Sequence, residues 1–163
     1  MANNVSGGSF MPADSTKPSA AEPKSMFVTN YLVGPNTACS GNGLLPTWRA
    51  NLKGTVRGDV KITLHTIGSP AAPMNVELFP DGAGGCESDL GSTGYMPPAA
   101  AQTVQVPPGP GVTEVVFEDV NFKVLGSLVL QLSIPGGPAN PYQVRVLYDS
   151  SSFASSIELP LAK

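Results

Sequence analysis

The chain has 163 residues and a formal net charge of −3, and 41% of its residues are hydrophobic. This length and hydrophobic content suit one domain with a core of its own. Charged residues make up only 13% of the chain, which is about half the usual share in a soluble domain. The nine basic residues are scattered, so the sequence disfavours nucleic-acid binding. No apolar run reaches membrane-spanning length, and 17 prolines and 18 glycines leave little room for long helices.

Residues 1–25 are rich in Ser, Ala, Pro, Asn and Gly and carry few bulky apolar side chains. Alone, such a segment cannot bury enough surface to offset its ordering entropy. We expect an extended N-terminal arm that is either disordered or ordered on a partner, with Phe10 and Met11 as its partner-binding anchors. The N-terminus lacks the basic and apolar regions of a signal peptide. We therefore expect that the protein stays where it is made, or that a leader has been removed.

The strongest structural pattern lies between Leu45 and Ile67, where apolar and polar residues alternate strictly. This is the period of a half-buried β-strand. Arg57-Gly58-Asp59 interrupts the two runs and suits a turn, because Gly58 relaxes the backbone geometry. A three-residue turn would pair Val56 with Val60 and keep both apolar sets on one face. We therefore expect a β-hairpin over residues 47–66.

The remaining sequence predicts short strands separated by turn signals. In chain order they cover residues 26–33, 74–79, 103–106, 112–120, 124–134, 142–148 and 155–161. Strand 124–134 carries apolar residues on both faces, which indicates a central strand. Strand 112–120 is expected to end at a turn near Asp119. Residues 80–101 form a long loop of the kind that often holds a ligand.

About nine short strands without a credible helix predict an all-β fold, an antiparallel β-sandwich. The topology is left open between a jelly roll and an Ig-like Greek key. The sandwich domain is expected to cover residues 26–163, preceded by the arm of residues 1–25.

No catalytic signature is present, and we expect no enzyme activity and no cofactor. The single histidine, His65, should lie on the solvent face of the hairpin opposite Asn51, without a nucleophile beside it. Asp81, Glu87 and Asp89 in the long loop are weak candidates for calcium ligands. Their spacing matches no known calcium loop, and the sequence favours a solvated acidic loop over a calcium site. Arg57-Gly58-Asp59 spells the tripeptide that integrins bind, but a turn already explains it.

Cys39 and Cys86 match no metal or redox spacing. They are either two buried thiols or a disulfide that would stabilise the fold by roughly 4 kcal/mol in the chain-entropy model. Trp48 should point into the core, which leaves Tyr95 in the long loop as the candidate aromatic for carbohydrate stacking.

Two functions agree with these patterns. The first is a structural protein of a large assembly, such as a virion capsid decoration or cement subunit, located in a virion or another extracellular assembly. Its partners would be copies of itself or other shell proteins, with no nucleic acid and no membrane. The alternative is a secreted or cell-surface accessory module that binds carbohydrate or another protein. The segment from Gly58 to Gly82, with its β-alternation and Pro-Asp-Gly turn, resembles the strand-turn pattern of bacterial pre-peptidase C-terminal domains, which implies the second function.

Overall fold

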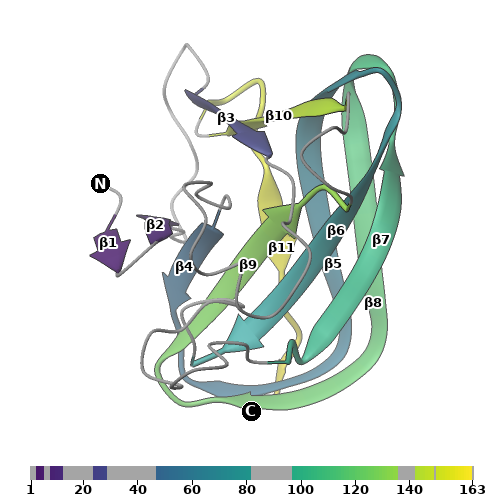
Figure 1. The fold of residues 1–163 in the computed structure, drawn as a ribbon. Coiled ribbons are helices and arrows are strands. Elements are labelled where there is room, and N and C mark those ends of the chain that lie inside the picture. Colours follow the sequence, from purple (N-terminus) through teal and green to yellow (C-terminus); the bar gives the residue numbers. More distant parts are fainter. Residues whose placement is uncertain are drawn as a thin grey trace.

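The computed structural model describes residues 3–5, 8–12, 24–28, 47–81, 97–135, 142–148 and 150–162. Every element in this part of the chain is a β-strand: β1 (Asn3–Val5), β2 (Gly8–Pro12), β3 (Lys24–Val28), β4 (Thr47–Asn51), β5 (Gly54–Ser69), β6 (Ala72–Pro80), β7 (Ala100–Val106), β8 (Gly109–Val124), β9 (Ser127–Ser133), β10 (Gln143–Tyr148), β11 (Ser156–Glu158) and β12 (Leu161–Ala162). The strands form two sheets (Figure 1). The predicted all-β sandwich is therefore confirmed.

The first sheet, sheet A, has the order β1-β2-β4-β9-β6-β7. Its pairs are antiparallel except β2 and β4, which are parallel. In the second sheet, sheet B, β5 pairs with β8 along one edge. Along its other edge β5 pairs in turn with β12, β11 and β10, and β3 lies beyond β10. Strand β5 is thus the element on which sheet B is built.

The core lies between the two sheets and is made by residues at alternate positions of their strands. Its fully buried side chains include Val56, Val60, Ile62, Leu64, Met74, Val76, Leu78, Leu132, Ile134, Val144 and Val146. Burial of each such side chain contributes about 1.5–3 kcal/mol relative to exposure. The aromatic ring of Trp48 packs partly buried against this cluster and meets Tyr148 edge to face, with 5.7 Å between ring centroids.

The predicted hairpin is wrong. Strand β5 runs through Arg57-Gly58-Asp59 as one element of 16 residues, and β4 belongs to the other sheet. The position numbers of Val56 and Val60 differ by an even number, so a continuous strand keeps both on the core face without any turn. Gly58 has a φ of 121° and lies under Pro160, where a Cβ would sit 3.5 Å from the proline ring.

A β-bulge opposite Asp59 explains why the core-facing positions of β8 change parity. Gly58 pairs with Val120 and Val60 pairs with Phe117, so β8 carries one more residue than β5 across this step. The extra residue lets Asp119 adopt a positive φ of 49°, and its N–H donates to Oδ1 of Asp59 at 3.1 Å. The turn predicted near Asp119 is therefore a bulge inside one strand.

The chain turns instead at Leu125 and Gly126, between β8 and β9. Every residue from Leu128 to Ser133 is buried, and β9 lies between β4 and β6. The prediction of a central strand in this region is confirmed.

Candidate ligand-binding face

Polar side chains form rows across the face of sheet A that points away from the core. We call Asn75, Glu77, Thr103, Gln131 and Ser133 the polar ladder. Asn75 of β6 pairs with Thr103 of β7 on one side and with Ser133 of β9 on the other, and Glu77 pairs with Gln131. Neighbouring polar side chains in register can hydrogen-bond across strands.

Hydrogen bonds join the members of each row. The hydroxyl of Thr103 donates to Oδ1 of Asn75 at 2.7 Å, and Nδ2 of Asn75 donates to Oγ of Ser133 at 3.4 Å. In the second row, Nε2 of Gln131 donates to Oε2 of Glu77 at 3.4 Å. The polar ladder thus combines amide, hydroxyl and carboxylate groups in a fixed arrangement.

Burial varies along the polar ladder. Gln131 and Ser133 on β9 are buried, Asn75 and Glu77 on β6 are half-buried, and Thr103 on β7 is exposed. The cross-strand pair of Phe79 and Val129, on the same face, is fully buried although neither residue belongs to the core cluster. Hydrogen-bonding groups beside buried apolar side chains are typical of ligand sites.

Glu77 is the ionisable member of the polar ladder. Burial raises the pKa of its carboxyl group above the ordinary glutamate value, and the hydrogen bond from Gln131 opposes this effect. Ionised Glu77 therefore lowers the stability of the fold. A carboxylate with a pKa shifted by burial is a feature of functional sites.

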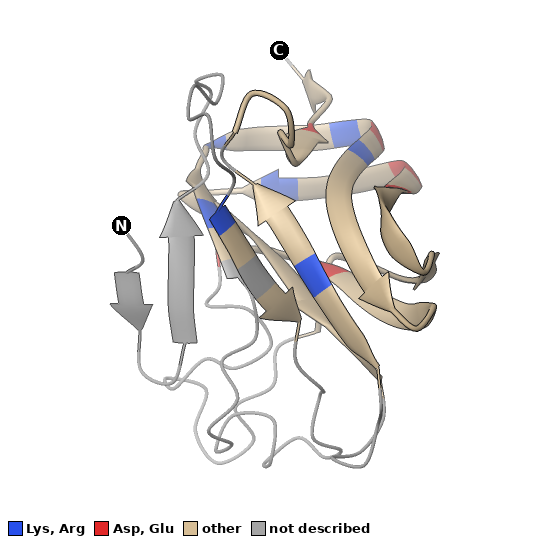
Figure 2. Ribbon diagram, turned by 90° about the horizontal axis from the view of Figure 1, so that it is seen from above, with Lys and Arg blue, Asp and Glu red and all other residues tan. Residues whose placement is uncertain are grey.

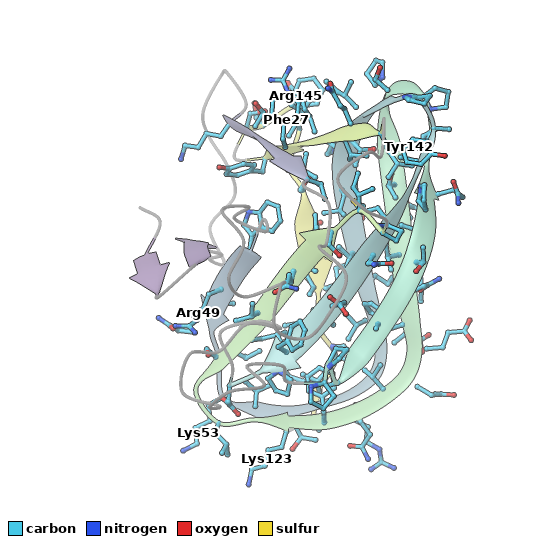
Figure 3. The ribbon with its side chains drawn as sticks, in the orientation of Figure 1. Phe27, Arg49, Lys53, Lys123, Tyr142 and Arg145 are labelled. Carbon is cyan, nitrogen blue, oxygen red and sulfur yellow. The ribbon has the colours of Figure 1, made fainter. Side chains whose placement is uncertain are left out.

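A cationic residue, Arg49, lies on the strand that pairs with the other side of β9. It lies on β4 in register with Val129 and is half-buried. Figure 3 labels Arg49 on β4, on the side of the molecule opposite β7. Elsewhere the charged residues of the described chain are dispersed and form no single patch (Figure 2).

His65 does not lie opposite Asn51, because the hairpin that would pair them does not exist. It sits on β5 between Val112 and Leu147. Its ring meets Phe153 edge to face with 5.7 Å between centroids, and its backbone N–H donates to Oγ of Ser155 at 3.0 Å. These contacts give His65 a packing role.

Several predicted residues lie outside the described part of the chain. They are Cys39, Cys86, Glu87, Asp89 and Tyr95. Phe10 and Met11 lie in β2, whose backbone alone is described. Strands β1 and β2 extend sheet A beyond β4, so part of residues 1–25 pairs with the sandwich of the same chain. The calcium, disulfide and arm hypotheses stay predictions.

Asp81 is described, and it holds the turn between β8 and β9. Its Oδ2 accepts the N–H of Leu125 at 2.6 Å, and its Oδ1 accepts those of Gly126 at 2.6 Å and Ser127 at 3.0 Å. The N–H of Asp81 in turn donates to the carbonyl oxygen of Ser127 at 2.6 Å. Partial desolvation raises the pKa of Asp81, but the hydrogen bonds outweigh it, so the net pKa is lowered.

We expect Asp81→Asn to lower the free energy of unfolding by about 0.5–1.5 kcal/mol at pH 7, with solvent exposure keeping the loss near the lower end. Asparagine keeps the left-handed backbone of Asp81, whose φ is 58°, but loses the charge. A lowered folded pKa stabilises the fold above the unfolded value of about 3.9 and ceases to do so as the pH falls through the folded value. The difference between the proteins should therefore shrink below about pH 4 in urea titrations.

The matched control is Asp59→Asn, because Asp59 accepts one backbone N–H where Asp81 accepts three. Its loss should be smaller. An Asp81 variant as stable as the Asp59 variant at pH 7 would contradict the role of Asp81 in the turn.

The structure thus defines a β-sandwich with a polar ladder on one outer face. Within the described ranges, no group of three His, Cys, Asp or Glu residues could hold a metal ion. The same residues include no helix long and apolar enough to cross a membrane.

No protein-family model and no curated protein sequence matches this chain. Solved structures share its fold at low identity. An aminopeptidase from the marine sediment archaeon Thaumarchaeota archaeon matches 91% of the chain with a TM-score of 0.57 and 12% identity. An α-amino acid ester hydrolase matches 96% with a TM-score of 0.55 and 15% identity. A CocE/NonD family hydrolase from Staphylococcus aureus matches 93% with a TM-score of 0.58 and 9% identity.

The chain spans about a third of the length of these hydrolases, namely 34%, 35% and 34%. At such identities the likeness concerns the fold alone.

Proposed function

We propose that this chain is a non-catalytic β-sandwich module that binds a neutral, hydroxyl-rich ligand such as a carbohydrate on the outer face of sheet A. The polar ladder carries this proposal. Asn75, Thr103 and Glu77 are half-buried or exposed and offer an amide, a hydroxyl and a carboxylate to a ligand. The buried Ser133 and Gln131 hydrogen-bond to Asn75 and Glu77 and hold these two side chains in place. Such groups suit the alternating donors and acceptors of sugar hydroxyls.

The energetics of Glu77 favour a binding role over a purely structural one. The fold would be more stable with a neutral group at this position, because burial disfavours the charged carboxylate. Proteins retain such groups where function needs them. A carboxylate in a partly desolvated place also accepts stronger hydrogen bonds from a ligand than one in water.

Similarity to parts of longer hydrolases supports an accessory role. In each of those proteins this fold accounts for about a third of the chain. We propose that the present sandwich is a secreted or cell-surface module that serves beside a hydrolytic enzyme. The chain itself is proposed not to be an enzyme, since the single histidine packs against Phe153.

A second candidate is a structural subunit of a large assembly, such as a virion capsid decoration or cement protein. Strands β1 and β2 favour it, because the N-terminal segment adds strands to the edge of sheet A. A segment that extends the sheet of its own chain can also extend the sheet of a neighbour. Its partners would then be copies of this chain or other shell proteins.

The test of the first proposal is binding to a panel of neutral oligosaccharides, followed by titration calorimetry on the tightest of them. We expect Glu77→Gln to weaken binding about 10-fold, which corresponds to about 1.4 kcal/mol for a hydrogen bond to a charged group. The variant should be more stable than the parent at pH 7 and equally stable below about pH 4, because a raised folded pKa destabilises only the ionised form. Lost binding could then not be ascribed to unfolding.

Glu114→Gln is the matched control. It makes the same change at an exposed position of β8 in the other sheet, and binding should be unaffected. Absence of binding to every neutral glycan would refute the first proposal. The same outcome together with sedimentation as large particles would favour the assembly subunit.

A further inference from the structure

Strand β7 is an open edge of sheet A. It pairs with β6 on one side and is the last strand in the sheet order (Figure 1). Ala101, Gln102 and Thr103 are all exposed, although alternate residues of a strand point to opposite faces. Among the described residues, no strand pairs with the second edge of β7, so the backbone groups along this edge are open to pairing. Unpaired strand edges are templates for pairing with another chain.

The sequence of β7, AAQTVQV, has neither a charged residue nor a proline. Its partner strand β6 pairs with it over Ala72 to Leu78 without a register shift, so β7 has no bulge that would twist its edge away. Strand β7 therefore lacks three common devices that prevent intermolecular pairing, namely a charged side chain, a proline and a bulge.

The other edges in the described part of the chain do carry such devices or are short. Strand β8 includes Pro110, Glu114 and Glu118 and the bulge at Asp119. Strand β3 has five residues and begins with Lys24. Strand β1 has three residues. In contrast to these edges, β7 carries no such protection, which indicates that its edge takes part in an interaction.

We propose that β7 pairs antiparallel with β7 of a second copy of this chain, with Thr103 at the twofold axis. Thr103 is the middle residue of the strand, so this register pairs all seven residues. Ala101 then faces Gln105, Gln102 faces Val104, and Ala100 faces Val106 of the second copy. Each pair joins positions of the same parity, so the outer and inner faces of sheet A continue across the axis.

The chemistry of the strand fits self-association better than association with a charged peptide. Two uncharged strands meet without like-charge repulsion, and paired threonines are favourable cross-strand neighbours. A closed twofold pairing also leaves no free β7 edge from which a fibre could grow. The row of Ser133, Asn75 and Thr103 would continue into the same row of the second copy.

The dimer is expected to be weak. Seven residues of antiparallel strand extend over about 24 Å. An interface of one strand pair is smaller than the roughly 800 Å² per partner of a standard stable interface. We therefore expect an equilibrium between monomer and dimer that depends on protein concentration.

The test is sedimentation velocity of the full chain across a wide concentration range. Thr103→Lys and Thr103→Glu should each weaken dimerisation at least 10-fold, because each places two like charges at the axis. An equimolar mixture of the two variants should dimerise again, since lysine then faces glutamate. Thr103 is exposed, and the melting temperature of each variant reports that it is folded.

Val112→Lys is the matched control, because it adds the same charge at a side chain that is 49% exposed on the outer face of sheet B. It should leave dimerisation unchanged. A parent protein that is monomeric throughout, or Thr103 variants that dimerise like the parent, would overturn the proposal. The readout is mass, so this result is independent of whether the polar ladder binds a glycan.

Discussion

Ile62→Ala is expected to lower the free energy of unfolding by about 2–5 kcal/mol. The side chain of Ile62 is only 1% exposed and lies near the middle of β5. Its backbone pairs with Val115 of β8 on one side and with Ile157 of β11 on the other. Both neighbouring strands are thus held in register, and the surrounding side chains cannot easily collapse into the space that the substitution leaves. Urea denaturation measures the loss as a lower midpoint with an unchanged slope.

Lys61→Ala is the control for this substitution. Lys61 is the preceding residue of the same strand and is exposed on the outer face of sheet B. Its change should stay within about 0.5 kcal/mol. Similar losses for both variants would contradict the assignment of the two faces of β5.

The faces of the strands could be predicted from the sequence because burial follows parity. Val56, Val60, Ile62 and Leu64 are all buried, as their alternation indicated. Parity does not, however, distinguish a turn from a strand that continues. Gly58 and Asp59 satisfy a hairpin turn, yet in the structure Gly58 sits against Pro160, about a hundred residues later in the sequence. Tertiary contact of this kind overrides a local preference.

The break between β8 and β9 could not be predicted for a related reason. Asp119 has the left-handed backbone of a turn residue, but Asp59 accepts its N–H and incorporates it into the strand as a bulge. The true turn at Leu125 and Gly126 depends on the carboxylate of Asp81, which is distant in the sequence. The sequence does contain one relevant signal, because Pro-Asp-Gly at 80–82 supplies an aspartate whose side chain can cap a turn elsewhere. This signal is useful only in combination with knowledge of which turn lies beside it in the fold.

The polar ladder was also not predictable, because its members come from three strands that are not all consecutive in the sequence. Asn75 and Glu77 alternate with core residues in β6, as do many solvent-facing residues. Only the pairing of β6 with both β7 and β9 brings them beside Thr103, Gln131 and Ser133. The side chain of Gln131 is buried, which is unusual for an amide. Its hydrogen bond to Glu77, which lies opposite it on β6, explains why this burial is tolerated.

Gly68→Ala is expected to destabilise the fold. Overpacked sites lose about 1–3 kcal/mol, and we expect a loss near the upper end of this range. Gly68 is buried near the end of β5. It lies beside the connection at residues 107–108, through which the chain crosses from β7 in sheet A to β8 in sheet B. A Cβ at this position would fall on the carbonyl oxygen of Pro107 and would lie 3.2 Å from Cγ1 of Val106. The nearest atom belongs to the backbone, so no side-chain rotation relieves the clash. Pro107 and Pro108 are also restricted in φ, which limits how far this corner can move.

Gly111→Ala provides the matched control for the same corner. A Cβ on Gly111 would meet Cγ of Pro107 at 3.5 Å, an ordinary van der Waals contact. The added methyl group should therefore be neutral or slightly stabilising, because alanine loses less backbone entropy than glycine on folding. Thermal unfolding of the two variants beside the parent gives the comparison. Equal melting temperatures for Gly68→Ala and Gly111→Ala would show that Pro107 moves away from the added methyl group. Close packing of this corner against β5 would then not be what holds the two sheets together.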